Sequence, residues 1–330
     1  MSWDKKGPRP LTTTIWYPTV QSGEGVASAP TAGNPLFAPL PPVIEGAVLA
    51  PNSQKYPLVL LSHGTGGSAL GLAWLGRFLA ARGYIVAALN HHGNTGAEPM
   101  PDPRGFLLWW ERAKDVSAVL DKLLNDPTFG PNIDRGRIGI AGFSLGGYTV
   151  LTVAGGRIDK TRYDRFCSSA ARDFTCGPQP EFPDAPKLFA ELKANDPVAQ
   201  ESLRHSGDSY RDPRVRAVFA IAPVFGSGFA AADLSAIKIP VEIVVGQGDK
   251  SAPPATNGQR YAALIPHAQL VLLPQSVGHY DFVPVCTDAG KKVLDRICHD
   301  EPGVDRARIQ TQVSTLAADF FDRTLPPSRN

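Results

Sequence analysis

Gly142-Phe-Ser-Leu-Gly-Gly147 decides the fold of this chain, because it follows the apolar run Arg137-Ile-Gly-Ile-Ala141 and precedes a segment of helical character. This strand–turn–helix context is the one in which a G-x-S-x-G motif forms a nucleophile elbow. A serine at so sharp a turn takes a strained backbone conformation, and glycines two residues before and after it let strand and helix pack closely. A chance match in a chain with 32 glycines is the alternative, so the surrounding sequence has to decide.

The composition indicates one large globular domain. The chain has 330 residues, of which 43% are hydrophobic, so it can bury a sizeable core and carry insertions. Its 33 basic and 31 acidic residues give a formal net charge of +2, which excludes an extended basic field for nucleic acid or an anionic membrane. No apolar stretch reaches the roughly 20 residues that span a bilayer, so no integral membrane segment is expected.

Four cysteines fall into two local pairs in loop-rich, charged stretches. An even count at short separations favours the disulfides Cys167–Cys176 and Cys286–Cys298 and an oxidising compartment. Four reduced thiols in a cytosolic protein are the alternative, since three connectivities are formally possible. The first seven residues lack the apolar region of a secretory signal. We therefore expect a periplasmic or secreted protein whose leader is absent from this chain, with a cytoplasmic location as the alternative.

Apolar runs and helical segments alternate along most of the chain. The expected strands cover residues 12–18, 57–61, 84–89, 137–141, 215–222, 241–245 and 269–273, and the expected helices cover residues 69–81, 106–124 and 304–325. A Pro-, Gly- and Ala-rich stretch over about residues 21–42 indicates a surface loop. Strands separated by helices predict an α/β fold with a doubly wound, mostly parallel sheet, whose ligands lie beyond the strand C-termini.

Residues 156–213 interrupt this alternation. They carry many charges, several prolines and one of the expected disulfides, but no strong strand pattern. Loops this long inside a compact domain are usually functional lids or insertions. We expect a cap over the site, inserted within a single domain of residues 1–330, with Leu188–Ala194 helical. A surface excursion remote from the chemistry is the alternative.

Three side chains with complementary chemistry follow three different strands. Ser144 stands on the elbow, Asp249 follows the strand 241–245, and His279 follows the strand 269–273. A serine hydroxyl needs a base within hydrogen-bond reach, and the base needs an acid to fix its tautomer. We therefore expect a catalytic group in which Ser144 attacks, His279 moves the proton and Asp249 orients the imidazole ring. This chain order is the one that accompanies the elbow motif.

Each of these assignments has an alternative. Asp249 could instead cap a helix that begins near Pro253, and His279 could be a surface residue. Asp281 is the main rival carboxylate, although its closeness in sequence to His279 favours support of the histidine loop. Glu98 and Asp102, in an earlier loop, are weaker rivals.

Two backbone N–H groups are the expected oxyanion donors. Leu145 directly follows the nucleophile, and Thr65 lies in Ser62-His-Gly-Thr-Gly-Gly67, a flexible loop that leads into a helix. His63 is expected to brace this loop rather than act as the base. A phosphate cradle is the rival interpretation of the glycines, but the chain has no G-x-x-x-x-G-K-[ST] motif.

Trp109 and Trp110 fall inside an expected helix. They could line an acyl or aromatic pocket, but two tryptophans in a helix more often lie in the core and at its rim.

With these residues identified, the chain resembles the predicted dienelactone hydrolase-like serine esterases, bacterial relatives of platelet-activating-factor acetylhydrolase within the α/β-hydrolase superfamily. The family's marks are Arg9-Pro-Leu, Ile15-Trp-Tyr-Pro18, Leu61-Ser-His-Gly-Thr65, His92-Gly-Asn94, the elbow, His279-Tyr-Asp-Phe282, Cys286, Cys298, Asp300 and Pro302-Gly-Val-Asp-Arg306. The chain departs from true dienelactone hydrolases in having Ser144 where they use cysteine, which argues against a lactone substrate.

The resemblance implies a Ser-Asp-His esterase that needs no metal or cofactor, is often exported, and uses Thr65 and Leu145 as oxyanion donors. We therefore expect a carboxylic-ester hydrolase that acts through an acyl-enzyme on a small-molecule or polymeric ester. An acyltransferase with the same residues and a non-catalytic binding protein of the same fold are the alternatives. The sequence makes no prediction of oligomeric state.

Overall fold

One mixed sheet forms the centre of the molecule. The computed structural model describes Trp3, residues 7–22 and residues 36–327, and in this part of the chain seven strands pair in the order β1-β3-β2-β4-β5-β6-β7. The strands are β1 (Thr13–Trp16), β2 (Tyr56–Ser62), β3 (Ile85–Leu89), β4 (Ile133–Phe143), β5 (Ala217–Ile221), β6 (Val241–Gly246) and β7 (Gln269–Leu273). Only β1 pairs antiparallel with its neighbour, so the predicted mostly parallel sheet is confirmed.

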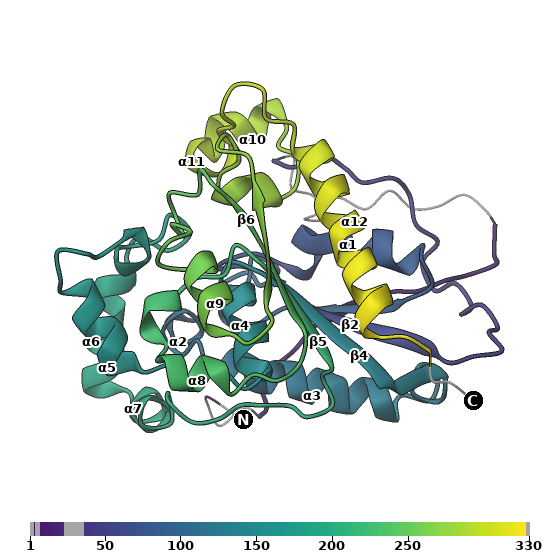
Figure 1. Ribbon diagram of the computed structural model, residues 1–330, viewed down its shortest axis with the longest axis horizontal. Helices are drawn as coiled ribbons and strands as arrows, with labels where there is room; N and C mark the ends of the chain where they lie inside the picture. The colour runs from purple at the N-terminus through teal and green to yellow at the C-terminus, as the bar shows by residue number, and fades with distance from the viewer. Residues whose placement is uncertain (1–2, 4–6, 23–35, 328–330) are drawn as a thin grey trace.

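Helices cover both faces of this sheet (Figure 1). One face packs against α3 (Glu111–Asn125), α4 (Leu145–Val153), α8 (Ala231–Ser235) and α9 (Gly258–Leu264), and the other face against α1 (Ala73–Ala80) and α12 (Arg306–Thr324). In β2, Leu58 and Leu60 point to the first face, whereas Val59 and Leu61 point to the second. Burial on both faces explains why the central strands are continuous apolar runs.

The expected helix over residues 106–124 is interrupted, which corrects the prediction. α2 (Pro103–Leu107) ends before Leu108, whose ψ of 60° is not helical, and α3 begins at Glu111. The indole of Trp109 donates a hydrogen bond to the carbonyl of Phe106 at 2.6 Å. That carbonyl would accept from the N–H of Trp110 in a continuous helix, so the side chain competes with the helical bond.

The segment 156–213 contains more helix than its sequence predicted. It holds α5 (Lys160–Cys167), the 3-10 helix η3 (Phe174–Cys176), α6 (Ala185–Asn195) and α7 (Pro197–Arg204). Helices α5, α6 and α7 gather at the opposite end of the molecule from α1 and α12 (Figure 1). The helix expected at Leu188–Ala194 is confirmed within α6. The starts of α5 and α7 are marked in the sequence by Asp159 and Asp196, whose side chains cap these two helices.

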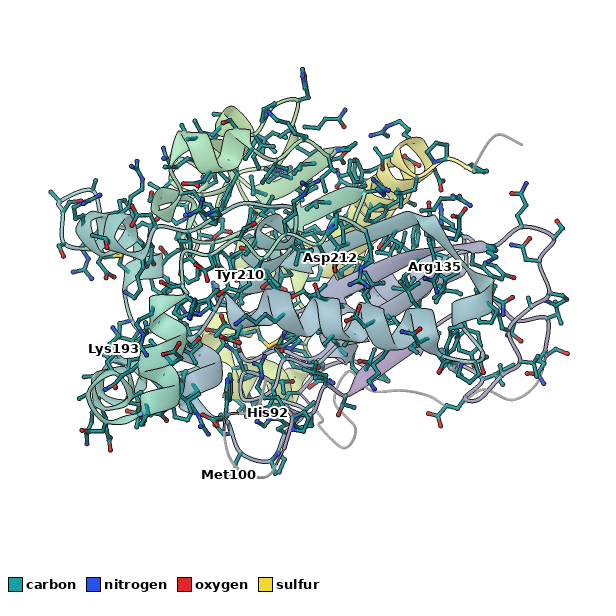
Figure 2. All side chains as sticks on the ribbon, turned by 90° about the horizontal axis from the view of Figure 1, so that it is seen from below. His92, Met100, Arg135, Lys193, Tyr210 and Asp212 are labelled. Carbon is teal, nitrogen blue, oxygen red and sulfur yellow. A yellow bond between two sulfur atoms is a disulfide. The ribbon has the colours of Figure 1, made fainter. Side chains whose placement is uncertain are left out.

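Two features fasten this segment. The predicted disulfide Cys167–Cys176 is present and ties the end of α5 to η3. At its C-terminal end, Tyr210 and Asp212 lie beside α3 (Figure 2). Asp212 accepts a hydrogen bond from the hydroxyl of Ser117 on α3 at 2.8 Å.

A second disulfide closes an excursion between β7 and α12. This stretch holds α10 (Asp288–Val293) and α11 (Asp295–Cys298), and the predicted disulfide Cys286–Cys298 spans it. Cys286 also forms an isolated bridge with Phe37. The remainder of the loop expected at 21–42 lies in part outside the described residues.

Candidate active site

Side chains from three parallel strands meet at the C-terminal edge of the sheet. β4 ends at Phe143, directly before Ser144, while Asp249 and His279 lie in the loops after β6 and β7. Parallel strands end at the same edge of a sheet, so residues distant in sequence come together there.

The backbone of Ser144 is strained, as the glycines two residues before and after it predicted. Ser144 has φ 56° and ψ −115°, a conformation that non-glycine residues rarely adopt. A Cβ at Gly142 would lie 2.3 Å from the carbonyl oxygen of Gly146, and one at Gly146 would lie 1.9 Å from the carbonyl oxygen of Ser62. The close approach of strand and helix therefore requires both glycines.

The three side chains form one hydrogen-bonded chain. His279 Nε2 lies 2.8 Å from Ser144 Oγ, and His279 Nδ1 lies 2.7 Å from Asp249 Oδ2. All three residues are buried. Because an ionised carboxylate only accepts, Nδ1 carries the proton toward Asp249, which leaves Nε2 free to accept from the serine hydroxyl. Asp249 Oδ1 also accepts from the N–H of Ala252 at 2.6 Å, so this carboxylate both caps the following turn and fixes the ring.

Two carboxylates act on the basicity of His279. Burial alone lowers the pKa of this imidazole, but the charge and hydrogen bond of Asp249 together with the charge of Glu181 raise the pKa above its usual value. The raised pKa means that these two charges favour the protonated, imidazolium form of His279.

The loop after β2 lies directly beside Ser144. A Cβ at Gly64 would lie 3.3 Å from Ser144 Cβ, and Thr65 lines the same cavity as Ser144. Leu145 is the first residue of α4, and the first N–H groups of a helix have no acceptor within the helix. The structure thus brings both expected donors to the side of Ser144.

A buried polar network holds this loop from behind. The N–H of His91 donates to His63 Nε2 at 3.1 Å, and His63 Nδ1 donates to the carbonyl of Gly64 at 2.7 Å. Arg112 of α3 donates to the carbonyl of His63. Burial and the charge of Arg112 lower the pKa of both histidines well below the usual value. His63 is therefore neutral and braces the loop, as its position in the sequence indicated.

The network continues away from the loop. His91 Nδ1 lies 3.0 Å from Asp115 Oδ2, and Arg9 donates to the other oxygen of Asp115. Burial raises the pKa of Asp115 to about 6 and lowers that of Arg112 to about 9.

Two cavities of different character adjoin Ser144 and His279. The first, of about 310 Å³, contains Ser144 and the loop around Thr65, and most of its remaining lining is apolar: Phe37, Leu72, Phe143, Phe282, Val283, Pro284, Leu294 and Ile297. The second, of about 860 Å³, contains His279, and its lining is mostly polar, including Lys250, Ser251, Asp295, Arg296, His299 and Glu301. Tyr280 borders both cavities.

Glu181, in the segment 156–213, contacts both halves of the site. Its carboxylate accepts a hydrogen bond from the Tyr280 hydroxyl at 3.0 Å, and a Cβ at Gly66 would lie 3.1 Å from Glu181 Cβ. Burial raises the pKa of this carboxyl. In the described residues, its second oxygen has no hydrogen-bond partner.

The rival carboxylates have other partners. Asp281 accepts from the N–H of Gly278 at 2.7 Å and so supports the histidine loop, and burial raises its pKa to about 6. Glu98 lies 2.8 Å from His92 Nδ1, and Asp102 caps α2.

The two tryptophans contact side chains that do not line the cavities of the site. Trp109 stacks on Phe225 with ring centroids 4.2 Å apart, and the buried indole of Trp110 donates to Ser202 at 2.9 Å. Neither residue lines the two cavities of the site, which favours the core-and-rim interpretation.

Three contributors to the site were not identified from the sequence. Arg112 could have been noticed as a charged residue on the apolar side of a helix, because it shares the buried face of α3 with Ala113, Val116 and Leu120. Glu181 carried no signal in the sequence, and the family mark His279-Tyr-Asp-Phe282 includes Tyr280 without giving it a role. Their contact joins loops about 100 residues apart and depends on how the segment 156–213 folds back. In the part of the chain described, no group of three or more His, Cys, Asp or Glu side chains could hold a metal ion, and no helix is long and apolar enough to cross a membrane.

With fold and geometry in place, the chain can be assigned to a family. Residues 58–295 match the Alpha/beta hydrolase family, which is most of the chain. The protein belongs to the α/β-hydrolase family, as its resemblance at the sequence level implied.

Curated relatives match a shorter stretch. Cutinase 2 of Thermobifida cellulosilytica is 31% identical over 117 residues, which are 34% of this chain and 40% of the cutinase. Platelet-activating factor acetylhydrolase of Cavia porcellus is 23% identical over 184 residues, 42% of each protein. The chain thus spans less than half the length of these relatives. The ferulic acid esterase of Streptomyces cinnamoneus shares the fold with a TM-score of 0.61 at 24% identity, covering 97% of this chain and 84% of that one.

Proposed function

We propose that this protein is a serine carboxylic-ester hydrolase that acts through an acyl-enzyme intermediate. The observation that carries the proposal is the continuous hydrogen-bonded chain from Ser144 Oγ through His279 to Asp249. Its cutinase and platelet-activating factor acetylhydrolase relatives support an ester as the substrate.

The proposed reaction has two halves. In the first, Ser144 Oγ attacks the ester carbonyl carbon while His279 Nε2 takes the hydroxyl proton, and the carbonyl oxygen becomes an oxyanion. The N–H groups of Thr65 and Leu145 would bind this oxyanion, each contributing about 3–4 kcal/mol in the transition state. Collapse of the intermediate breaks the bond to the alcohol oxygen, which receives the proton from His279. In the second half, water gives a proton to His279 and attacks the acyl carbon. Collapse of this intermediate breaks the bond to Ser144 Oγ, which takes the proton back from His279, and the acid is released.

The two cavities suggest an orientation for the bound ester, with its acyl and alcohol groups on different sides of the site. The departing alcohol must reach the proton on His279, and His279 borders the polar cavity of about 860 Å³. The acyl carbon is bonded to Ser144, which lies in the mostly apolar cavity of about 310 Å³. We infer that the acyl group occupies the smaller cavity and the alcohol the larger one. A volume of about 860 Å³ on the alcohol side suits either a small-molecule ester or one end of a polymeric ester.

Two further proposals concern the segment 156–213 and the protein's location. We propose that the segment acts as a cap, because it supplies Glu181 to the wall of the acyl cavity. The two disulfides support a periplasmic or secreted location.

The reaction is tested by assaying nitrophenyl esters of increasing acyl length and one insoluble polyester, with product analysis. We expect release of free acid, with kcat/KM highest for acyl groups that fit about 310 Å³. Transfer of the acyl group to added alcohol in preference to water would instead indicate an acyltransferase. No turnover of any ester would favour a binding protein.

The pH dependence of the reaction reports on the charges around His279. We expect kcat/KM to rise with pH along a limb set by this imidazole, because Nε2 must be unprotonated to accept from Ser144. Its midpoint should lie above the usual histidine value of 6.5, because Asp249 and Glu181 raise the pKa of His279 despite burial. Glu181→Gln removes one of these charges, so the limb should move to lower pH.

The matched control for this pH profile is Glu191→Gln, which removes the same charge from α6 in the same segment. It should leave the acidic limb where it is in the parent protein. An unmoved limb in Glu181→Gln, or an equal movement in both variants, would contradict the proposed coupling.

A further inference from the structure

A pocket lined by arginines lies apart from the proposed active site. Its volume is about 330 Å³, and its lining residues, here called the arginine pocket, are Arg162, Arg165, Phe166, Ser169, Ser227 and Arg260. They come from α5 and the residues just after it, from the 3-10 helix η4 (Gly226–Gly228) and from α9. None of them lines either cavity beside Ser144 and His279.

Backbone carbonyls hold two of these arginines in place. Arg162 Nε donates to the carbonyl of Ser227 at 3.1 Å. Arg260 donates through Nε to the carbonyl of Gly226 and through Nη2 to that of Phe229, both at 2.9 Å. A guanidinium has five N–H donors, so these bonds leave donors on both side chains for another partner. The disulfide at Cys167 fixes the end of the helix that carries Arg162.

Within the described residues, Arg162, Arg165 and Arg260 form no ion pair within 4.0 Å, and no carboxylate lines the pocket. Three carboxylates of neighbouring elements have other partners: Asp164 pairs with Lys160 at 2.7 Å, Asp173 accepts from Thr256 and Asn257, and Asp159 accepts from the backbone N–H of Arg162 as the cap of α5.

The arginines also act on one another. Burial lowers the pKa of Arg260, and the charge of Arg162 lowers it further. The guanidinium groups of Arg162 and Arg260, both held by backbone carbonyls, therefore repel each other. An anion bound between them would relieve this repulsion.

We propose that the arginine pocket binds a phosphate group. The planar guanidinium fork pairs with phosphate oxygens through two parallel hydrogen bonds, and a dianion matches several arginines better than a single carboxylate does. The phosphate can be free or can belong to a lipid headgroup. Because α5 belongs to the segment 156–213 and the other two elements to the remainder of the domain, a bound phosphate would fasten the segment to the core.

Thermal unfolding in the presence of inorganic phosphate tests the proposal. With ionic strength held constant by chloride, the Tm of the parent protein should rise with phosphate concentration, since a ligand that binds only the folded state stabilises it. The double variant Arg162→Gln/Arg260→Gln should weaken phosphate binding by at least about tenfold, the loss expected for one charge-assisted hydrogen bond. Isothermal titration calorimetry measures the same affinity directly.

Two further variants keep the test decisive. Arg165→Gln removes a charge from the pocket and none of the backbone bonds above, so it should weaken phosphate binding even if the double variant folds poorly. Arg308→Gln removes a charge from an exposed position on α12 and should leave phosphate binding unchanged. The proposal is overturned if phosphate has no effect beyond that of chloride, or if Arg165→Gln and Arg308→Gln both bind phosphate as the parent does.

Vesicle sedimentation separates the two sources of the phosphate. Phosphatidylcholine vesicles with and without phosphatidic acid are compared, using the parent protein and Arg165→Gln. Binding that needs both phosphatidic acid and Arg165 supports a lipid headgroup as the ligand. Phosphate binding in solution without vesicle binding supports a free phosphate.

Discussion

Ser144→Ala is expected to abolish ester hydrolysis, with kcat falling by at least about 10⁴-fold. The reason is that the hydroxyl 2.8 Å from His279 Nε2 is the only group in the proposed mechanism that forms the acyl-enzyme. Burst-phase and steady-state assays with a short-chain nitrophenyl ester measure the loss. Circular dichroism and Tm should stay close to those of the parent, because removing one oxygen leaves the elbow and its glycines intact.

Ser235→Ala is the matched control for this substitution. It removes the same oxygen from an exposed position on α8, and ester turnover should not change. A fluorophosphonate probe should label the parent and Ser235→Ala but not Ser144→Ala. Turnover by Ser144→Ala close to that of the parent would remove Ser144 as the nucleophile.

Gly146→Ala is expected to prevent formation of the native fold, with a loss of stability of more than about 4 kcal/mol. The added Cβ would lie 1.9 Å from the backbone carbonyl oxygen of Ser62, and no side-chain rotation can relieve a contact between two backbone-fixed atoms. Helix α4 would have to move away from β2, which would open a closely packed core. Soluble yield and chemical denaturation measure the effect.

Gly207→Ala provides the comparison for this loss. A Cβ at Gly207 meets its nearest neighbour at an ordinary distance of 3.5 Å, so unfolding should change by less than about 1 kcal/mol. If Gly146→Ala unfolds at the same denaturant concentration as Gly207→Ala, the helix and strand are not as closely fixed as the elbow geometry requires.

The central architecture could be predicted because it depends on local patterns. Each parallel strand is an apolar run that ends in turn residues, and the glycines around Ser144 mark the elbow without reference to distant contacts. The interruption between α2 and α3 could not be predicted in this way, because the indole of Trp109 bonds a carbonyl that the helix would otherwise use. Helices α5 and α7 were not predicted for another reason: each has only eight residues and few of them are buried, so little apolar sequence marks them.

The expected catalytic residues could be named because chain order and strand ends limit which side chains can meet. The residues that surround and support them could not be named from the sequence. Glu181 reaches Tyr280 only after the segment 156–213 has folded back over the sheet edge. Arg112 is an arginine on the core-facing side of a helix, and the sequence does not reveal that its partner is the carbonyl of His63.

The disulfide Cys286–Cys298 has a consequence for how this protein can diversify. Leu294 and Ile297, which border the proposed acyl cavity, belong to the stretch that this covalent bond closes, whereas Ser144, Asp249 and His279 belong to other loops. Substitutions inside the ring can reshape the binding surface while its two ends stay fixed. Evolution, or a library of loop exchanges between the two cysteines, can therefore change the lining of this cavity without disturbing the proposed catalytic residues.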